Sequence, residues 1–307
     1  VGNLQTLRID YCIEQYLIFR SKIILMEYRL HTNGWTPIVE KFDLRNATYN
    51  DVELISNLIY KYTTIVIKKQ DIDIPTQLRV IKMFNNPTSL YENDNEYVVP
   101  NTDGVLLKVG GSGGISDHVG QMDWHHDFHW QLKYKPSLIW LHGIRDVIGS
   151  TTTYTNNILA YQRMPNGIKK ELESLHAVLM KSQDFDVDTF KQDPDGTYWP
   201  PGEIVNDYKA KVVRMNQTGN KYMYFPFNQI HHFEGMTREE SKEIILEVKK
   251  YITDPAYLYV HKWDTGDIVI SDQWSGLHKR DKCEFIESRR IYRALFDYVN
   301  QEHRTGQ

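Results

Sequence analysis

The chain has 307 residues, of which 41% are hydrophobic and 25% charged, so it is long enough to bury a substantial core. Its formal net charge of −4 gives no basic footprint, which argues against nucleic acid as a partner. The two cysteines, Cys12 and Cys283, are too few for a disulfide framework or a cysteine-based zinc site, and they fit a reducing compartment.

The N-terminal part of the chain contains no clear membrane or secretion signal. Its most apolar stretch, residues 16–26, is interrupted by Arg20, Ser21 and Lys22. We therefore expect a cytoplasmic protein that does not bind a membrane. Residues 1–40 are expected to form an extension packed on the core, and residues 41–307 a single domain. The sequence leaves homo-oligomerisation open.

The first expected elements alternate between helix and strand. Residues 51–60 place their apolar side chains on one side, and Asp51 could cap this helix. The β-branched residues 63–67 predict a strand. Pro75 suits the N-terminus of a second helix that runs to Phe84.

The second half of the chain predicts mainly short strands. They are expected near residues 137–142, 257–263, 267–272 and 290–296, and residues 237–251 predict a helix that begins with a capping box. Many short strands with turn residues between them, plus a few helices, favour a jelly roll over a parallel sheet. We therefore expect a mainly β (α+β) fold, a double-stranded β-helix core with flanking helices.

A glycine run, Gly-Gly-Ser-Gly-Gly at residues 110–114, precedes the most informative motif. It lacks the spacing of a phosphate-binding loop, and no lysine follows at the right place. It predicts a flexible loop, and its position raises the hypothesis of a mobile lid over a site.

Three residues separated by a long gap suggest a metal site: His125 and Asp127 in one motif, and the distant His278. Alternation along a strand directs residues i and i+2 to the same side, so His125 and Asp127 can face one metal while His126 points away. Two histidines and one carboxylate form the face that holds Fe(II) and leaves open positions for reactants. The run His232-Phe233-Glu234 is a competing, weaker match.

Several motifs resemble the taurine dioxygenase-like family of Fe(II)/2-oxoglutarate oxygenases. The resemblance covers residues 63–296 in ordered blocks, and it is carried by residues 63–70, Trp124-His125-His126-Asp127, Gly149-Ser150-Thr151-Thr152-Thr153-Tyr154, Lys211-Val212-Val213-Arg214, Trp263-Asp264-Thr265-Gly266-Asp267 and Arg289-Arg290-Ile291-Tyr292-Arg293. It implies Fe(II) as cofactor, held by His125, Asp127 and His278, with 2-oxoglutarate and O2 as co-substrates. The implied reaction hydroxylates a small polar molecule and releases succinate and CO2.

The resemblance also assigns residues to the co-substrate. Arg290 immediately precedes an apolar residue of the last strand, as the co-substrate arginine of the family does, and Thr152 matches the threonine beside it. A guanidinium can pair with a carboxylate through two hydrogen bonds. Arg293 in the same strand is a further candidate. Arg289 and Arg293 are both an odd number of residues from Arg290, so both are expected on the strand's other face.

The expected substrate contacts are less specific. Taurine-specific members of the family carry an arginine four residues after the co-substrate arginine, where this chain has Ala294, so a sulfonate substrate is in doubt. Gln121 or Met122 precedes the metal motif, and Asn228 and Gln229 fall in the corresponding pocket region.

Two other functions stay open. One is a jelly-roll binding protein for small molecules that has lost turnover. The other is a metal-dependent hydrolase in which the same three ligands hold zinc and activate water. The presence of all three ligands together with the arginine strand favours the oxygenase.

Overall fold

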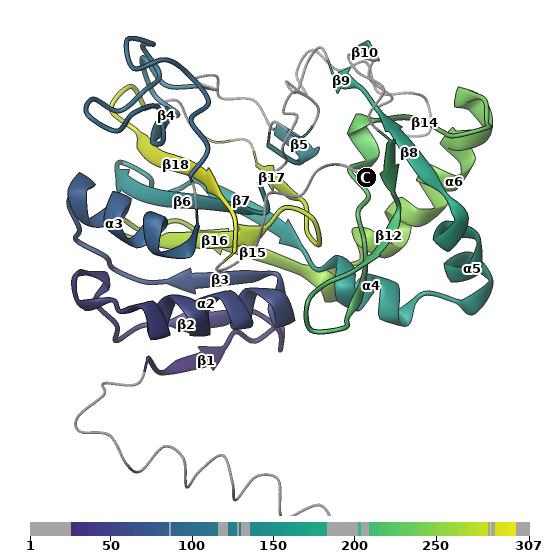
Figure 1. The fold of residues 1–307 in the computed structure, drawn as a ribbon, viewed down its shortest axis with the longest axis horizontal. Coiled ribbons are helices and arrows are strands. Elements are labelled where there is room, and N and C mark those ends of the chain that lie inside the picture. Colours follow the sequence, from purple (N-terminus) through teal and green to yellow (C-terminus); the bar gives the residue numbers. More distant parts are fainter. Residues whose placement is uncertain are drawn as a thin grey trace, which may run out of the picture.

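In a computed structural model of the chain, the described residues are 26–85, 87–115, 122–127, 129, 136–182, 202–203, 209–281, 283 and 286–298. Two antiparallel-rich sheets dominate them (Figure 1). Predictions that fall on other residues, including Gln121 and most of the N-terminal extension, lie outside this part of the chain.

The larger sheet has seven strands in the order β1-β2-β3-β16-β6-β18-β4. Only the pair β2–β3 is parallel among its pairings. The strands are β1 (Tyr28–Leu30), β2 (Pro37–Val39), β3 (Thr64–Ile67), β16 (Ile268–Asp272), β6 (Leu138–Arg145), β18 (Arg290–Phe296) and β4 (Leu107–Val109). Residues 28–39 thus add two strands to one edge of this sheet, while the division at residue 40 stays a prediction.

The smaller sheet has four antiparallel strands in the order β15-β7-β17-β5. They are β15 (Leu258–Lys262), β7 (Thr151–Thr155), β17 (His278–Arg280) and β5 (Met122–His125). Its residues Tyr154 and Tyr259 share a buried cluster with Ile139 and Leu141 of the larger sheet. The two sheets therefore pack face to face, as in a jelly roll.

Two helices cover the outer face of the larger sheet: α2 (Tyr49–Tyr62) and α3 (Ile74–Phe84) (Figure 1). The alternation of β16 explains this double burial, because Ile268 and Ile270 pack in the helix-side cluster and Val269 in the cluster between the sheets. The helix α2 begins earlier than predicted. Thr48 is its N-cap, and Asp51 closes a capping box from the third helical position.

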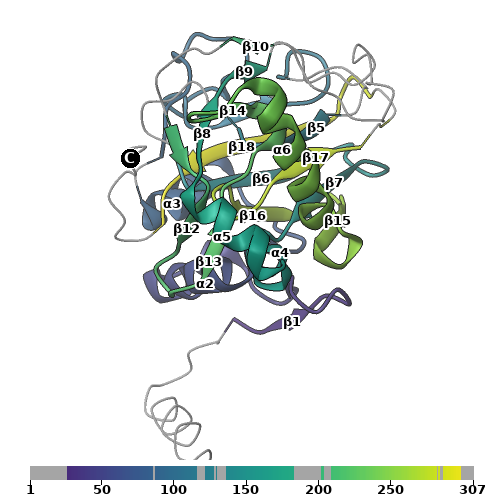
Figure 2. The ribbon, with the colours of Figure 1, turned by 90° about the vertical axis from the view of Figure 1, so that its right-hand side faces the viewer.

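A second lobe holds the remaining helices, which Figure 2 shows side by side. They pack on small sheets around a separate buried cluster. The lobe contains α4 (Asn157–Arg163), α5 (Asn166–Ser174), α6 (Arg238–Ile252), β8 (His176–Leu179), β11 (Lys209–Lys211), β12 (Val213–Met215), β13 (Lys221–Met223) and β14 (Ile230–Phe233). The capping box predicted for α6, Thr237 with Glu240, is present.

Short elements complete the described chain: η1 (Leu44–Asn46), β9 (Lys181–Ser182), β10 (Gly202–Glu203), η2 (Phe227–Gln229) and η3 (Pro255–Tyr257). None of the described helices has the length and apolar character required to cross a bilayer. The prediction of a mainly β fold with flanking helices is confirmed.

Candidate metal centre and arginine-lined cavity

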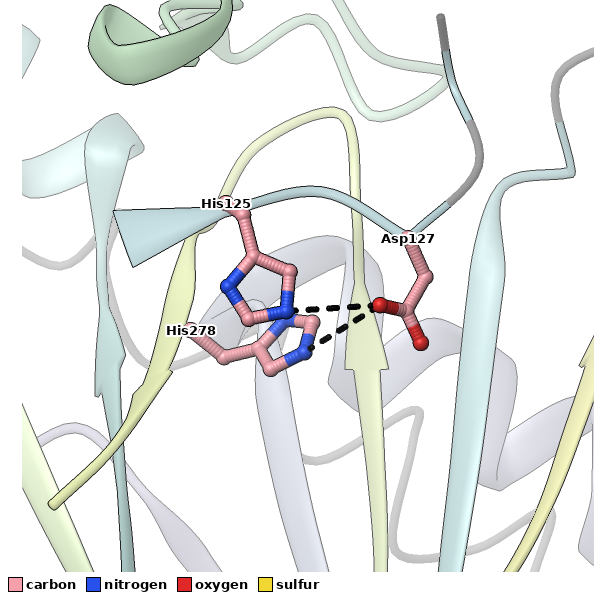
Figure 3. A group of neighbouring side chains, drawn as sticks. All are labelled: His125, Asp127 and His278. Atoms are coloured by element: carbon pink, nitrogen blue, oxygen red, sulfur yellow. Dashed lines mark ion pairs between the residues drawn. The ribbon is translucent and has the colours of Figure 1, made fainter. Parts of the chain in front are cut away.

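Three predicted ligands meet on the inner face of the smaller sheet. His125 ends β5 and His278 begins β17, and the two residues are direct partners across these antiparallel strands. Paired residues project to the same face of a sheet, so both imidazoles point inward. Asp127 follows β5 by two residues, and its carboxylate turns toward both rings (Figure 3).

The geometry of these side chains fits a metal ion. Asp127 Oδ1 lies 3.4 Å from His125 Nε2 and 3.9 Å from His278 Nε2. All three residues are buried, and one ligand atom from each lies within 4.8 Å of the others. Two ligand atoms bound at about 2.1 Å to one ion stand roughly 3.0–3.5 Å apart in octahedral or tetrahedral geometry. A small adjustment of side chains would therefore complete the site.

The protonation states also suit metal binding. His125 Nδ1 donates a hydrogen bond of 2.6 Å to the Asp123 carbonyl oxygen, and Nε2 is the ring nitrogen that faces Asp127. Burial lowers the pKa of His278 to about 3, and the neighbouring His125 and Arg293 act in the same direction. At neutral pH His278 is therefore an unprotonated ligand.

Asp127 is held as a carboxylate by its neighbours. Burial alone would raise its pKa, but the charge of Arg293, the hydrogen bond with His125 and the nearby His278 hold the pKa well below its usual range. The pair is direct, because Arg293 Nη1 lies 2.7 Å from Asp127 Oδ2. Arg293 thereby occupies one carboxylate oxygen and leaves Oδ1 facing the two histidines.

Two glutamine side chains hold the backbone of the metal-binding turn. The Asp127 amide donates to Gln273 Oε1 at 2.7 Å, and the His126 amide donates to Gln229 Oε1 at 3.0 Å. Gln229 Nε2 returns a bond of 3.1 Å to the His126 carbonyl. These backbone amides lie beyond the end of β5, where no neighbouring strand offers them a carbonyl acceptor, so the glutamine side chains accept their hydrogen bonds.

Two of the predicted substrate residues, Asn228 and Gln229, contact the metal-binding strand instead of the cavity. Asn228 Nδ2 donates to Asp123 Oδ2 at 2.6 Å and to the Trp124 carbonyl at 3.2 Å, while Gln229 holds His126. Within the described residues, neither side chain lines the cavity beside the metal ligands, whereas Met122 does. Gln121 lies outside the described residues. Asn228 and Gln229 thus support the metal-binding strand, a role that residue type alone did not reveal.

We expect Gln273→Met to weaken metal binding without unfolding the protein. The variant keeps the volume of the side chain but removes the acceptor of the Asp127 amide, and loss of a group that orients a metal ligand typically costs about 10- to 100-fold in affinity. Titration of Mn(II) or Fe(II) measures the effect, with the melting temperature of the metal-free protein as control. Unchanged metal affinity would show that Gln273 does not orient Asp127.

A cavity of ≈ 50 Å³ opens beside the metal ligands and between the two sheets. Among the described residues, its cationic lining consists of Arg280, Arg289 and Arg293, and Asp127 is its one carboxylate. The remaining lining residues are Val109, Met122, His125, Leu141, Thr152, His278 and Ile291. The cavity therefore joins a metal site to a strongly cationic wall.

The structure places Arg289, instead of Arg290, in this cavity. Arg289 is 4% exposed, and its Nη2 atom lies 3.4 Å from Ser150 Oγ. Burial lowers its pKa, and the like charge of Arg280 adds to this effect. Arg289, Ile291 and Arg293 alternate along one chain direction and all line the cavity, so Arg290 falls on the other face.

Arg290 is engaged elsewhere. Its Nη1 donates to the Gly110 carbonyl at 3.0 Å and its Nη2 to the Ser112 carbonyl at 2.8 Å. The expectation that Arg290 faces the metal is thus corrected by the parity of the strand. Thr152 does line the cavity, as expected, and its Oγ1 accepts a hydrogen bond of 2.9 Å from Trp263 Nε1.

The competing motif at residues 232–234 has no such arrangement. His232 Nδ1 lies 2.8 Å from His231 Nδ1, and Glu234 pairs with Lys209. In the part of the chain that the structure describes, the only group of three or more potential metal ligands is His125, Asp127 and His278.

A double-stranded β-helix that carries two histidines and one carboxylate on an inner face defines the class of non-haem Fe(II) oxygenases. Residues 29–295 match the taurine catabolism dioxygenase TauD, TfdA family, and the chain belongs to this family. The enzyme class expected from the sequence is confirmed: an Fe(II)- and 2-oxoglutarate-dependent dioxygenase.

Individual relatives are distant. The chain is 22% identical over 271 residues to the alpha-ketoglutarate-dependent 2,4-dichlorophenoxyacetate dioxygenase of Cupriavidus pinatubonensis, which covers 83% of this chain and 92% of that protein. Among solved structures, AAD-2 in complex with Mn(II) and N-oxalylglycine has a TM-score of 0.65 at 18% identity, covering 91% of this chain and 99% of the other. A taurine dioxygenase from Burkholderia xenovorans has a TM-score of 0.67 at 17% identity and covers 89% of each chain. These structures share the jelly-roll fold.

Proposed function

We propose that the chain hydroxylates a small polar molecule and releases succinate and CO2. The observation that carries this proposal is the single cavity that joins His125, Asp127 and His278 to the buried Arg289 and to Thr152. When bound, Fe(II) together with 2-oxoglutarate and O2 supplies the oxidising power for the reaction. The protein must hold the metal, orient the co-substrate and exclude water.

Three residues have proposed roles at the metal. His125 and His278 offer the Nε2 lone pairs, and Asp127 offers Oδ1. Arg293 binds the other carboxylate oxygen and so favours coordination through one oxygen. The buried position of all three ligands keeps bulk water away from the reacting atoms.

The co-substrate carboxylate is proposed to bind Arg289, which takes over the role first assigned to Arg290. A buried guanidinium next to the like charge of Arg280 favours an anionic partner. Thr152 supports the same position. Its oxygen already accepts a hydrogen bond from Trp263, so its hydroxyl proton is available for a carboxylate.

The substrate itself is proposed as a small polar molecule. Three guanidinium groups and one carboxylate from the described residues line the cavity, so an acidic or neutral group fits this lining better than a bare amine. Relatives named for 2,4-dichlorophenoxyacetate and for sulfate esters are consistent with an acidic substrate. With Arg289 as the co-substrate arginine, the position four residues later is Arg293, which lines the cavity, so the argument from Ala294 against a sulfonate substrate no longer applies.

We also propose a cytoplasmic location, one catalytic domain over residues 41–307 with residues 1–40 packed on it, and no nucleic-acid partner. The low number of cysteines, two, supports the cytoplasmic location, and the net charge of −4 argues against a nucleic-acid partner. Homo-oligomerisation stays open.

Succinate formation tests the proposed function. The Fe(II)-loaded protein should release succinate from 2-oxoglutarate in air, and small polar acids should be screened for those that stimulate the release. A hydrolase would instead turn over with Zn(II) and need neither O2 nor 2-oxoglutarate. A binding protein would bind a ligand without producing succinate.

A further inference from the structure

The glycine run, residues 110–114, lies against the start of β18. Its backbone is held by several hydrogen bonds: the Ser112 amide donates to the Glu287 carbonyl at 2.9 Å, and the Gly110 amide donates to the Ile115 carbonyl at 2.9 Å. Arg290 adds its two bonds to the carbonyls of Gly110 and Ser112. The run is therefore a fixed part of the cavity's supporting structure, in contrast to the lid hypothesis.

Gly110 is in contact with the proposed co-substrate arginine. A Cβ atom at Gly110 would lie 2.1 Å from Arg289 Nη1 and 3.3 Å from Arg289 Cζ. Real Cβ atoms do not approach other atoms so closely, so any side chain at this position would displace the guanidinium. Only glycine lets Arg289 pack directly on the backbone here.

The neighbouring glycine has a different reason to be small. A Cβ atom at Gly111 would meet the Arg289 carbonyl oxygen at 2.4 Å and the Glu287 carbonyl oxygen at 2.5 Å. These contacts are with backbone, so a substitution there would separate the run from residues 287–290. Gly111 thus sets the distance between the two segments, whereas a Cβ atom at Gly110 would meet the side chain of Arg289.

We propose that the glycine run positions Arg289. Gly110 packs against the Arg289 guanidinium, and Arg290, from the other face of β18, fixes the backbone of Gly110 and Ser112 through its two hydrogen bonds. The inference rests on the proposed role of Arg289 in binding the distal carboxylate of 2-oxoglutarate. It gives Arg290 a positioning role one step removed from the co-substrate.

The physical benefit is preorganisation. An arginine side chain loses rotamer entropy when it is fixed. A guanidinium already held between Gly110 and Ser150 has lost part of this freedom before the ligand arrives, so less affinity is sacrificed on binding. Displacing it should weaken 2-oxoglutarate binding and leave the metal ligands unaffected.

Two alanine variants form a matched pair. Gly110 has φ +73° and Gly113 has φ +68°, so alanine has a similar backbone penalty at either position. At Gly113, however, a Cβ atom would have nothing within 4 Å. We expect Gly110→Ala to raise the dissociation constant of N-oxalylglycine on the Mn(II)-loaded protein by about tenfold or more relative to Gly113→Ala, which is about 1.4 kcal/mol. Mn(II) affinity should be equal in the two variants.

A sharper test repeats the Gly110→Ala substitution in protein that already carries Arg289→Ala. In Arg289→Ala protein, Gly110→Ala should affect N-oxalylglycine binding no more than Gly113→Ala does, because its Cβ would meet no guanidinium. Equal dissociation constants for Gly110→Ala and Gly113→Ala, or an undiminished effect of Gly110→Ala without Arg289, would overturn the inference.

A third variant covers the case in which Gly110→Ala does not fold. Arg290→Gln removes the two hydrogen bonds to the glycine run without adding a Cβ atom. It should raise the dissociation constant of N-oxalylglycine by less than Arg289→Ala does. No change for Arg290→Gln would contradict its positioning role. If Arg289→Ala itself left binding unchanged, the proposed function of Arg289 would fail and the inference with it. If Arg289→Ala weakened binding and neither Gly110→Ala nor Arg290→Gln did, the inference alone would fail.

Discussion

Substitution of His278 by alanine should abolish turnover and most of the affinity for Fe(II). Within the part of the chain that the structure describes, His278 supplies one of the two imidazoles of the metal site, directly across the strand pair from His125. His278 is buried and uncharged at neutral pH. Its removal therefore takes away a metal ligand but breaks no ion pair that stabilises the fold. The variant should therefore stay folded. Metal titration and succinate release measure the two effects.

His125→Ala and Asp127→Asn should behave similarly toward the metal. Asp127→Asn is preferable to alanine, because alanine would break the buried pair with Arg293, and removing one partner of such a pair typically costs about 3–5 kcal/mol of stability. His232→Ala is the matched control from the competing motif and should retain iron and activity. Full iron occupancy in His278→Ala, or loss of iron in His232→Ala, would show that the ligands are misassigned.

Arg289→Ala should raise the apparent KM for 2-oxoglutarate far more than that for the primary substrate. Truncating one partner of a buried charged pair typically costs about 2–5 kcal/mol, which corresponds to roughly 30-fold to several-thousand-fold in affinity. Arg289→Lys should recover part of the loss, since an ammonium cannot make the forked contact with a carboxylate. Iron affinity should stay near that of the unmodified protein.

The other two arginines of the last strand serve as comparisons. Arg290→Ala should have a smaller effect on the same KM, because its guanidinium binds the glycine run instead of the cavity. Arg293→Ala should act mainly on iron binding, because Arg293 pairs with a metal ligand. A large and selective 2-oxoglutarate defect in Arg290→Ala with none in Arg289→Ala would contradict the assignment.

The metal site could be predicted from sequence because its information is local. His125 and Asp127 occupy one short motif, and strand alternation alone indicates that they share a face. The late histidine needed the family resemblance, since nothing local shows that β17 pairs with β5. The structure supplies that pairing as a direct partnership of His125 and His278.

The co-substrate arginine was predicted one residue too late in the strand, although the sequence contained the information that favours Arg289. Motif position favoured Arg290, whereas parity along the strand sets Arg289 with Ile291 and Arg293 on one face. A bulge between β18 and β6 changes the register between Arg290 and Ile291 without changing that parity on β18. Parity was the better guide, because the alternation of a strand is enforced by backbone geometry.

The roles of Asn228, Gln229 and the glycine run depend on contacts between distant segments. Gln229 reaches residue 126 across 103 positions, and Arg290 reaches Gly110 across 180. Neither composition nor periodicity encodes such partners. An amide side chain near a site can bind a ligand or a backbone group equally well, and only the fold decides between them.

Anaerobic titration of the Fe(II)-loaded protein with 2-oxoglutarate, followed by visible absorption, tests the central claim most directly. Chelation of Fe(II) by 2-oxoglutarate produces a weak metal-to-ligand charge-transfer band. The band should appear in the unmodified protein, require a much higher 2-oxoglutarate concentration in Arg289→Ala, and be absent in His278→Ala. No band in the unmodified protein, or an undiminished band in His278→Ala, would contradict an Fe(II)/2-oxoglutarate site at these residues.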